Sequence, residues 1–156
     1  MRRDLVICID FSGNRERVYG LVAARKGDLA RLAALLPLFP HYSDIKTKLS
    51  KKKALKLFPR RLARAKPYLV ELVVSKNLDD ILSALRKLQP KVYEAYADIH
   101  VFKAVRSALP NIPVRTEDKR RLKGGKPGVL TLFNIVDLAM NYYKKYGKSP
   151  LSSKTP

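Results

Sequence analysis

Three aspartates stand out in this sequence because each one ends or interrupts an apolar segment. Asp10 ends an apolar run near the N-terminus, Asp98 follows the run 92–97, and Asp137 lies within the apolar segment 134–140. A carboxylate buried beside such a segment needs a cation or a hydrogen-bond donor, since burial without a partner costs several kcal/mol. Carboxylate oxygens are also the ligands that Mg²⁺ prefers. We therefore take these three aspartates as candidate metal ligands and candidate catalytic residues.

The chemistry open to such a carboxylate cluster is phosphoryl transfer. Two divalent cations ~3.5–4 Å apart can activate water and stabilise the leaving oxygen of a phosphodiester. We expect Mg²⁺ or Mn²⁺ as the cofactor, with Glu71 as a weaker fourth candidate. A purely structural role, in which each aspartate pairs with a nearby Arg or Lys, stays open. Most of the other acids have ordinary predicted places, Asp28, Asp79 and Asp80 at helix starts and Glu16, Asp44, Glu117 and Asp118 in turns or loops.

The charge of the chain points to a polyanionic partner. The 156 residues fit one domain, and 33 Lys and Arg against 13 acids give a net charge of +20 and a pI near 10.3. Like charges repel in a compact domain, and ~2–8 net charges suffice for solubility. A uniformly solvated basic surface is the alternative. We expect a nucleic acid as the partner, RNA rather than DNA, with the ribosome as one setting.

The cations cluster in two segments rather than covering the chain evenly. Residues 41–66 hold ten basic residues and one acid, and residues 115–126 hold six basic residues and two acids. The segment 46–66 is typical of a helix, or two short helices separated at Pro59, with cations outward and leucines inward. The glycine pair at 124–125 predicts a loop whose backbone can approach phosphates, without the spacing of a nucleotide-hydrolysing loop. The candidate nucleic-acid-binding residues are Lys46, Lys48, Lys51, Lys52, Lys53, Lys56, Arg60, Arg61, Arg64, Lys119, Arg120, Arg121, Lys123 and Lys126.

Several other classes of protein are excluded by what the sequence lacks. A single cysteine, Cys8, rules out internal disulfides and multi-cysteine zinc sites, and the two histidines lie far apart at 41 and 100. The apolar run 5–9 is too short for a signal peptide, and no stretch approaches the ~20 apolar residues of a membrane span. No amphipathic segment pairs its cations with a broad aromatic face, so membrane-surface binding has little support. We expect a cytoplasmic protein.

The pattern of apolar and turn residues predicts alternating strands and helices. Continuous apolar runs predict buried strands, and Ala- and Leu-rich periodic segments predict helices. We expect a hairpin of strands 5–11 and 17–25, strands at 68–74 and 92–97, an extended piece at 112–115, and helices at 29–36, 46–66, 77–88, 99–109 and 129–146. This order predicts an α/β domain with a mixed sheet over residues 1–146 and a basic, flexible tail at 147–156.

The order of elements and two short motifs resemble the RNase H-like superfamily. The motifs are Ile9-Asp10-Phe11-Ser12-Gly13 and Asn134-Ile135-Val136-Asp137-Leu138-Ala139, similar to the I-D-E-S-G and I-Q-L-A-D-L stretches of its small uncharacterised members. The resemblance implies a five-stranded mixed sheet, an N-terminal β-hairpin, flanking helices and metal-dependent cleavage of nucleic acid. It also implies a third strand at 29–36, where helix propensity predicts a helix. Both a strand and a helix therefore stay open for residues 29–36.

Two departures from the family pattern support a second function. Phe11 stands where the family has Glu after the first aspartate, and no acid occurs in 46–66 to supply the usual helix glutamate. Three carboxylates can hold one cation but hold two poorly. The sequence therefore supports a divalent-metal-dependent nuclease and, as the alternative, a non-catalytic RNA-binding or ribosome-associated protein that keeps the fold.

Overall fold

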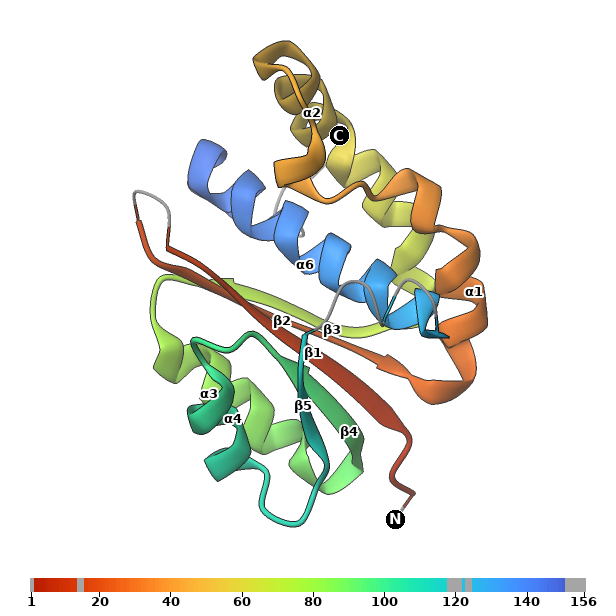
Figure 1. Ribbon diagram of the computed structural model, residues 1–156, viewed down its shortest axis with the longest axis vertical. Helices are drawn as coiled ribbons and strands as arrows, with labels where there is room; N and C mark the ends of the chain where they lie inside the picture. The colour runs from red at the N-terminus through yellow and green to blue at the C-terminus, as the bar shows by residue number, and fades with distance from the viewer. Residues whose placement is uncertain (1, 14–15, 118–121, 123–124, 151–156) are drawn as a thin grey trace.

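The centre of the fold is a five-stranded sheet in the order β3-β2-β1-β4-β5 (Figure 1). The computed structural model describes residues 2–13, 16–117, 122 and 125–150. β1 pairs antiparallel with β2 and parallel with β4, β2 pairs antiparallel with β3, and β4 pairs parallel with β5. The strands are β1 (Leu5–Ser12), β2 (Val18–Arg25), β3 (Leu69–Ser75), β4 (Val92–Ala97) and β5 (Val114–Thr116).

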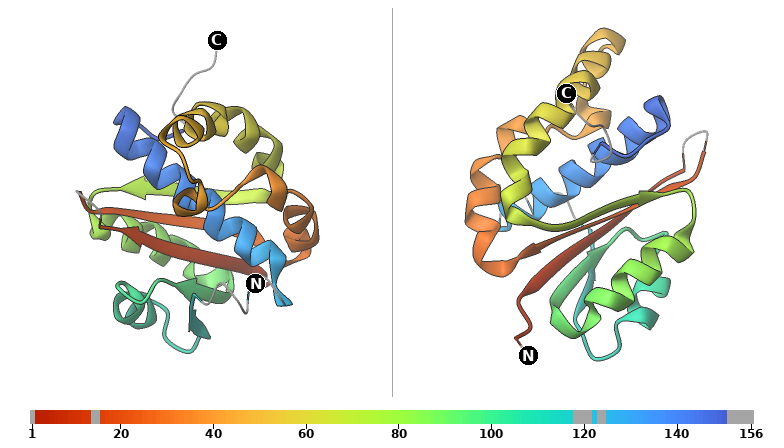
Figure 2. Two further views of the ribbon diagram at one scale, coloured as in Figure 1. Left: turned by 45° about the horizontal axis from the view of Figure 1, so that its top comes forward. Right: turned by 180° about the vertical axis from the view of Figure 1, so that it is seen from behind.

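Helices cover both faces of the sheet (Figures 1 and 2). α1 (Leu29–Ala34), α2 (Lys48–Ala65) and α6 (Pro127–Tyr146) lie on one face, and α3 (Leu78–Leu88) and α4 (Phe102–Ala108) lie on the other. Side chains alternate across a strand, so β1 contributes Val6 and Cys8 to the core under α6 and Ile7 and Ile9 to the core under α3. Burial on both faces explains why β1 is a continuous apolar run.

α6 lies directly against the sheet beside Asp10. Asp10 is paired with Gly20 of β2, and a Cβ at Gly20 would come within 2.4 Å of the Cγ2 of Val136 in α6. The glycine therefore permits an approach that any side chain would block. Every residue of α6 from Gly128 to Met140 is buried, so this part of the helix is covered around its circumference. At its end Tyr142 is buried and Tyr143 is only partly so.

α2 is one helix rather than two. Its N-terminus is capped by Thr47, whose Oγ1 accepts from the backbone N–H of Ser50 at 3.0 Å. Pro59 lies inside the helix, and the residues around it pack inward: Leu55, Phe58 and Leu62 are buried in the core under α6. Burial of this apolar face offsets the hydrogen bond that Pro59 removes.

The structure confirms the expected fold class and resolves the conflict at residues 29–36. The α/β mixed sheet, the N-terminal hairpin and the flanking helices are present. Residues 29–34 form α1, as their propensity predicts, and the third strand of the chain is β3, which is the edge of the sheet next to β2. Within the described residues, no helix combines the length and apolar character needed to cross a membrane.

Candidate metal centre

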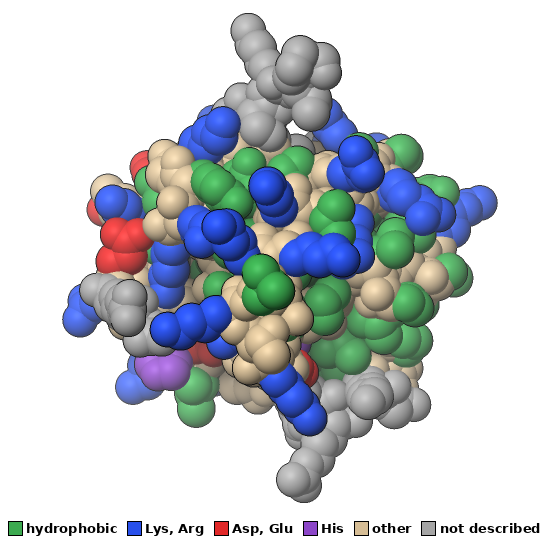
Figure 3. Space-filling model, turned by 90° about the horizontal axis from the view of Figure 1, so that it is seen from above, with side chains coloured by type: hydrophobic (Ala, Val, Ile, Leu, Met, Phe, Trp, Pro, Cys, Tyr) green, Lys and Arg blue, Asp and Glu red, His purple; other side chains and the backbone are tan. Residues whose placement is uncertain are grey.

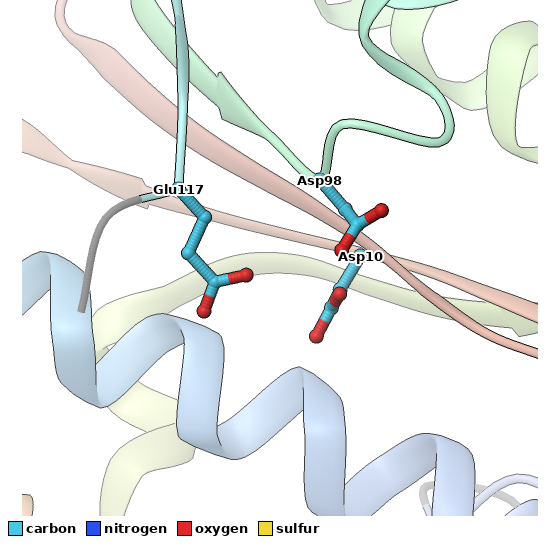
Figure 4. Close-up of side chains that lie close together, drawn as sticks. All are labelled: Asp10, Asp98 and Glu117. Atoms are coloured by element: carbon cyan, nitrogen blue, oxygen red, sulfur yellow. The ribbon is translucent and has the colours of Figure 1, made fainter.

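Three neighbouring parallel strands end in carboxylates at the same level of the sheet. Asp10 lies near the end of β1, and Asp98 and Glu117 come directly after β4 and β5. The backbone N–H of Asp98 donates to the carbonyl of Ile9 at 2.9 Å, and that of Glu117 donates to the carbonyl of Ala97 at 3.2 Å. Since pairing in register puts side chains of one row on one face, all three carboxylates face α6 (Figure 4).

These three side chains form a compact group, which we call the acidic triad: Asp10, Asp98 and Glu117. One carboxylate oxygen from each lies within 4.8 Å of the others, and Asp10 is only 6% exposed. Asp98 is held in place by His100, whose backbone N–H donates to its Oδ1 at 2.8 Å and whose Nδ1 lies 2.7 Å from the same oxygen. Figure 4 shows the three carboxylates converging on the space between the strand ends and α6.

The electrostatics of Asp10 favour a bound cation. Burial raises the pKa of Asp10 well above its usual range, and the charges of Glu117, Asp137 and Asp98 raise the pKa further. The hydrogen bond from the backbone N–H of Phe11, at 2.8 Å, acts in the opposite direction. In the described part of the chain, no ion pair joins Asp10 to a basic side chain. A cation would supply the missing charge.

The donor set of the acidic triad fits a hard divalent cation. All three ligand atoms are carboxylate oxygens, the donors that Mg²⁺ and Mn²⁺ prefer over nitrogen and sulfur. Mg²⁺ keeps several waters when it is bound by a few carboxylates, so three protein oxygens are compatible with its six-coordinate shell. Divalent metal binding is therefore compatible with this cluster, and two of its three members, Asp10 and Asp98, are candidates from the sequence.

Asp137, the third aspartate expected to be a ligand, lies in α6 outside the acidic triad. It is buried, and its Oδ2 accepts from the backbone N–H of Tyr42 at 2.8 Å and lies 3.7 Å from Nε2 of His41. These partners replace the Arg or Lys that a structural role was expected to need. The charge of Asp137 still contributes to the raised pKa of Asp10, so the two carboxylates are electrostatically coupled. The metal-ligand role of Asp137 stays a prediction.

Glu117 is the member of the triad that sequence reasoning missed. The sequence alone predicts Glu117 in a turn or loop, whereas it directly follows β5. Its position two residues after the predicted extended segment 112–115, close to a strand end like Asp98, is the signal that would have found it. Glu71, the weaker candidate, lies in β3 opposite Ala23, on the other edge of the sheet and outside the triad.

The predicted basic residues of segment 46–66 form an exposed surface along α2. Figure 3 shows Lys and Arg side chains gathered on this side of the molecule. Lys51 and Arg61 are partly covered, Lys51 with its Nζ 5.2 Å from the centre of the Tyr42 ring and Arg61 donating to the carbonyl of Leu38. The exposed members, which we call the α2 cations, are Lys46, Lys48, Lys52, Lys53, Lys56, Arg60 and Arg64.

The second basic segment is only partly described. Lys119, Arg120, Arg121 and Lys123 lie outside the described residues. Lys126, directly before α6, donates from its Nζ to the hydroxyl of Tyr96. Tyr96 in turn donates to Oε1 of Glu94 at 3.1 Å, so Lys126 is joined to a polar network of β4 rather than standing alone.

Comparison with known proteins identifies the fold. No family model matches the chain, and no curated protein matches it in sequence. Among solved structures, the ribonuclease H2 from Pyrococcus horikoshii OT3 is similar, with a TM-score of 0.51 and 16% sequence identity. The match covers 97% of this chain and 81% of that chain. At this level of identity the likeness concerns the fold alone. The chain has an RNase H-like fold.

Proposed function

We propose that this chain is a basic nucleic-acid-binding protein that hydrolyses phosphodiester bonds with Mg²⁺ or Mn²⁺. The observation that carries the proposal is the acidic triad: three carboxylates at the ends of three adjacent parallel strands, with ligand oxygens within 4.8 Å. Burial and the neighbouring carboxylates raise the pKa of Asp10, so ionising the whole cluster is unfavourable without a cation, and such perturbed groups are typical of functional sites. The similar fold of a ribonuclease H2 supports the same reaction class.

Each residue of the site has a part in the proposed reaction. Asp10, Asp98 and Glu117 would hold the cation, and Asp137 would add a fourth carboxylate from α6. His100 orients Asp98 through the contacts on its Oδ1. When bound, the cation would activate water and stabilise charge on the leaving oxygen. In the hydrolysis a water oxygen bonds to phosphorus, one P–O ester bond breaks, and the leaving oxygen takes up a proton.

The α2 cations supply the proposed binding surface for the substrate. Their side chains are exposed on the helix that packs beside α6, on the face of the sheet toward which the triad points. Cations placed this way bind phosphates without reading bases, so we propose binding that is largely independent of sequence, with RNA preferred.

The proposal is tested by measuring the thermal midpoint and strand cleavage with and without metal. A cation that binds only the folded chain raises the midpoint by mass action. We expect millimolar Mg²⁺ or Mn²⁺ to raise the midpoint of the wild type and to be required for cleavage of labelled RNA. Glu117→Gln should lose both effects, because it removes a ligand charge at nearly constant shape.

The matched control is Glu71→Gln, which makes the same chemical change at the opposite edge of the sheet. This variant should keep the metal response and the cleavage of the wild type. A wild-type midpoint that ignores both metals, together with absence of cleavage, would overturn the proposal. Equal metal responses in Glu117→Gln and the wild type would exclude the triad as the binding site.

A second function is favoured by the residue after Asp10. Phe11 occupies the position of the family glutamate, and its ring packs 5.2 Å from the rings of Tyr19 and His100. Phe11 packs against the core under α3, on the opposite face of the sheet from the triad, so this position supplies no carboxylate, which favours a non-catalytic RNA-binding or ribosome-associated protein with the same fold. Tight RNA binding without metal-dependent cleavage, and with a metal response intact, would select this alternative.

A further inference from the structure

A polar cleft lies on the far side of Asp137 from the acidic triad. It has a volume of about 880 Å³ and lies between α6, the first turns of α2, the segment 41–43 and the β1–β2 hairpin. The basic side chains that line it come from three separate elements: His41 from the loop, Lys51 from α2, and Lys144 and Lys145 from α6. Convergence of cations from distant parts of a chain on one cavity raises the local concentration of anions there.

Lys144 is held in this cleft by a hydrogen bond to the end of β1. Its Nζ donates to Oγ of Ser12 at the end of β1, which fixes the side chain across the cleft. Burial lowers the pKa of Lys144 from its ordinary value, while the charges of Glu16 and Asp137 partly oppose this. A partly desolvated ammonium group is stabilised by an anion. The cleft therefore favours an anionic ligand.

The two acids that line the cleft have partners of their own. Glu16 lies 3.4 Å from the Nζ of Lys76, which is outside the cleft. Asp137 accepts from the backbone N–H of Tyr42 at 2.8 Å and lies 3.7 Å from Nε2 of His41. Both acids therefore make contacts outside the lysines of the cleft, and four basic side chains face these two acids, so an excess of basic groups lines the cavity.

α6 connects this cleft with the acidic triad. Asp137 lines the cleft, and its neighbour Val136 packs against Gly20, the residue of β2 that is paired with Asp10, so this part of α6 lies between the two sites. Lys144 lies seven residues, or about two turns and ~10 Å, further along the helix. A polyanion lying along α6 can therefore place one phosphate at the triad and another in the cleft.

We propose that this cleft binds a backbone phosphate of the nucleic acid, beside the phosphate at the acidic triad. The inference rests on the proposed function and deepens it: Lys51 and Lys144 hold the strand, and the α2 cations make only its outer contacts. The ligand is a phosphodiester within a strand, not free phosphate. Binding in the cleft needs no divalent cation.

The experiment compares two double variants for binding to a fluorescein-labelled single-stranded RNA in EDTA at several salt concentrations. The cleft variant is Lys51→Ala with Lys144→Met, and its matched control is Lys87→Ala with Lys91→Ala, two exposed lysines at the end of α3 and just after it. We expect the cleft variant to bind about tenfold more weakly. Its slope of log affinity against log salt should be shallower by about 0.7 for one lost phosphate contact. The control should match the wild type.

Further measurements keep the outcomes distinct. The single variant Lys51→Ala, which leaves the Lys144–Ser12 contact in place, should show part of the loss, so misfolding of the double variant cannot imitate the result. Equal affinity and slope for the cleft variant and the control would overturn the inference, even if the metal response of the triad is intact. Competition by millimolar inorganic phosphate without any effect of the variant on RNA affinity would also overturn it. An unresponsive triad combined with a cleft effect would overturn only the enzymatic function.

Discussion

At the scale of single residues, the raised pKa of Asp10 links the stability of the chain to pH. Its folded-state pKa lies above the unfolded value of ~3.9, so the folded chain retains this proton more tightly. The corresponding stability is fully present below the unfolded pKa and is lost as pH rises through the folded pKa. We expect Asp10→Asn to be more stable than the wild type in EDTA near neutral pH, with an advantage that grows with pH.

Urea denaturation of both proteins at a series of pH values measures this difference. Asp79→Asn, an exposed acid on the other face of the sheet, should show no such growing advantage. Addition of Mg²⁺ should reduce the difference in stability between Asp10→Asn and the wild type, because the cation favours the ionised triad of the wild type. A constant difference between Asp10→Asn and the wild type over the whole pH range would contradict the prediction.

The two candidate roles of Asp137 can be separated at the same scale. Asp137→Asn keeps an oxygen that can accept from the Tyr42 N–H but removes the charge, so we expect a weaker metal-induced rise in midpoint at nearly unchanged stability. Asp137→Ala leaves the Tyr42 N–H without this acceptor, and it should also lower the free energy of unfolding by about 1–3 kcal/mol. An unchanged metal response in Asp137→Asn would reduce this residue to a structural partner of the loop at 41–42.

At the scale of elements, the close packing of α6 on β2 fixes the position of α6 relative to the acidic triad. The Cβ of an alanine at Gly20 would lie 2.4 Å from Val136 and 3.1 Å from Met140, so Gly20→Ala must push α6 away from β2. We expect a loss of about 1–3 kcal/mol in the free energy of unfolding and a weaker metal response. Gly27→Ala is the control, since nothing lies within 4 Å of a Cβ there. Equal thermal midpoints for the two variants would show that α6 can move away from β2 without a loss of stability.

The elements of this fold were predictable, but the site was only partly so. Apolar runs and helix propensity predict the strands and α1 because these signals are local. The acidic triad depends on the register between β4 and β5, which is a non-local property, and Glu117 therefore reads as a loop residue in the sequence alone. The continuity of α2 through Pro59 also depends on non-local contacts, because packing against α6 outweighs the helix-breaking tendency of the proline. The cleft at Lys144 combines three distant segments and has no sequence signature.

At the scale of the whole molecule, the acidic triad and the α2 cations lie in separate parts of the structure. The acidic triad lies at the ends of β1, β4 and β5 (Figure 4), while the α2 cations lie outward on the helical layer (Figure 3). If ~6 phosphates are neutralised, log affinity against log salt should have a slope near −5 for a duplex and about −4 for a single strand. A salt-independent affinity would remove the electrostatic basis of binding.

This separation predicts that binding and metal response fail independently. Replacing Lys52, Lys53 and Lys56 by Ala removes three α2 cations without loss of helix propensity, because Ala is the strongest helix former. We expect weaker RNA binding and a flatter salt slope at an unchanged metal-induced rise in midpoint. Glu117→Gln should do the reverse, since loss of a negative charge leaves binding in EDTA equal to or tighter than that of the wild type. Fluorescence anisotropy and thermal unfolding measure the two properties on the same samples. Loss of the metal response in the triple lysine variant would show that the helical layer and the triad act as one site.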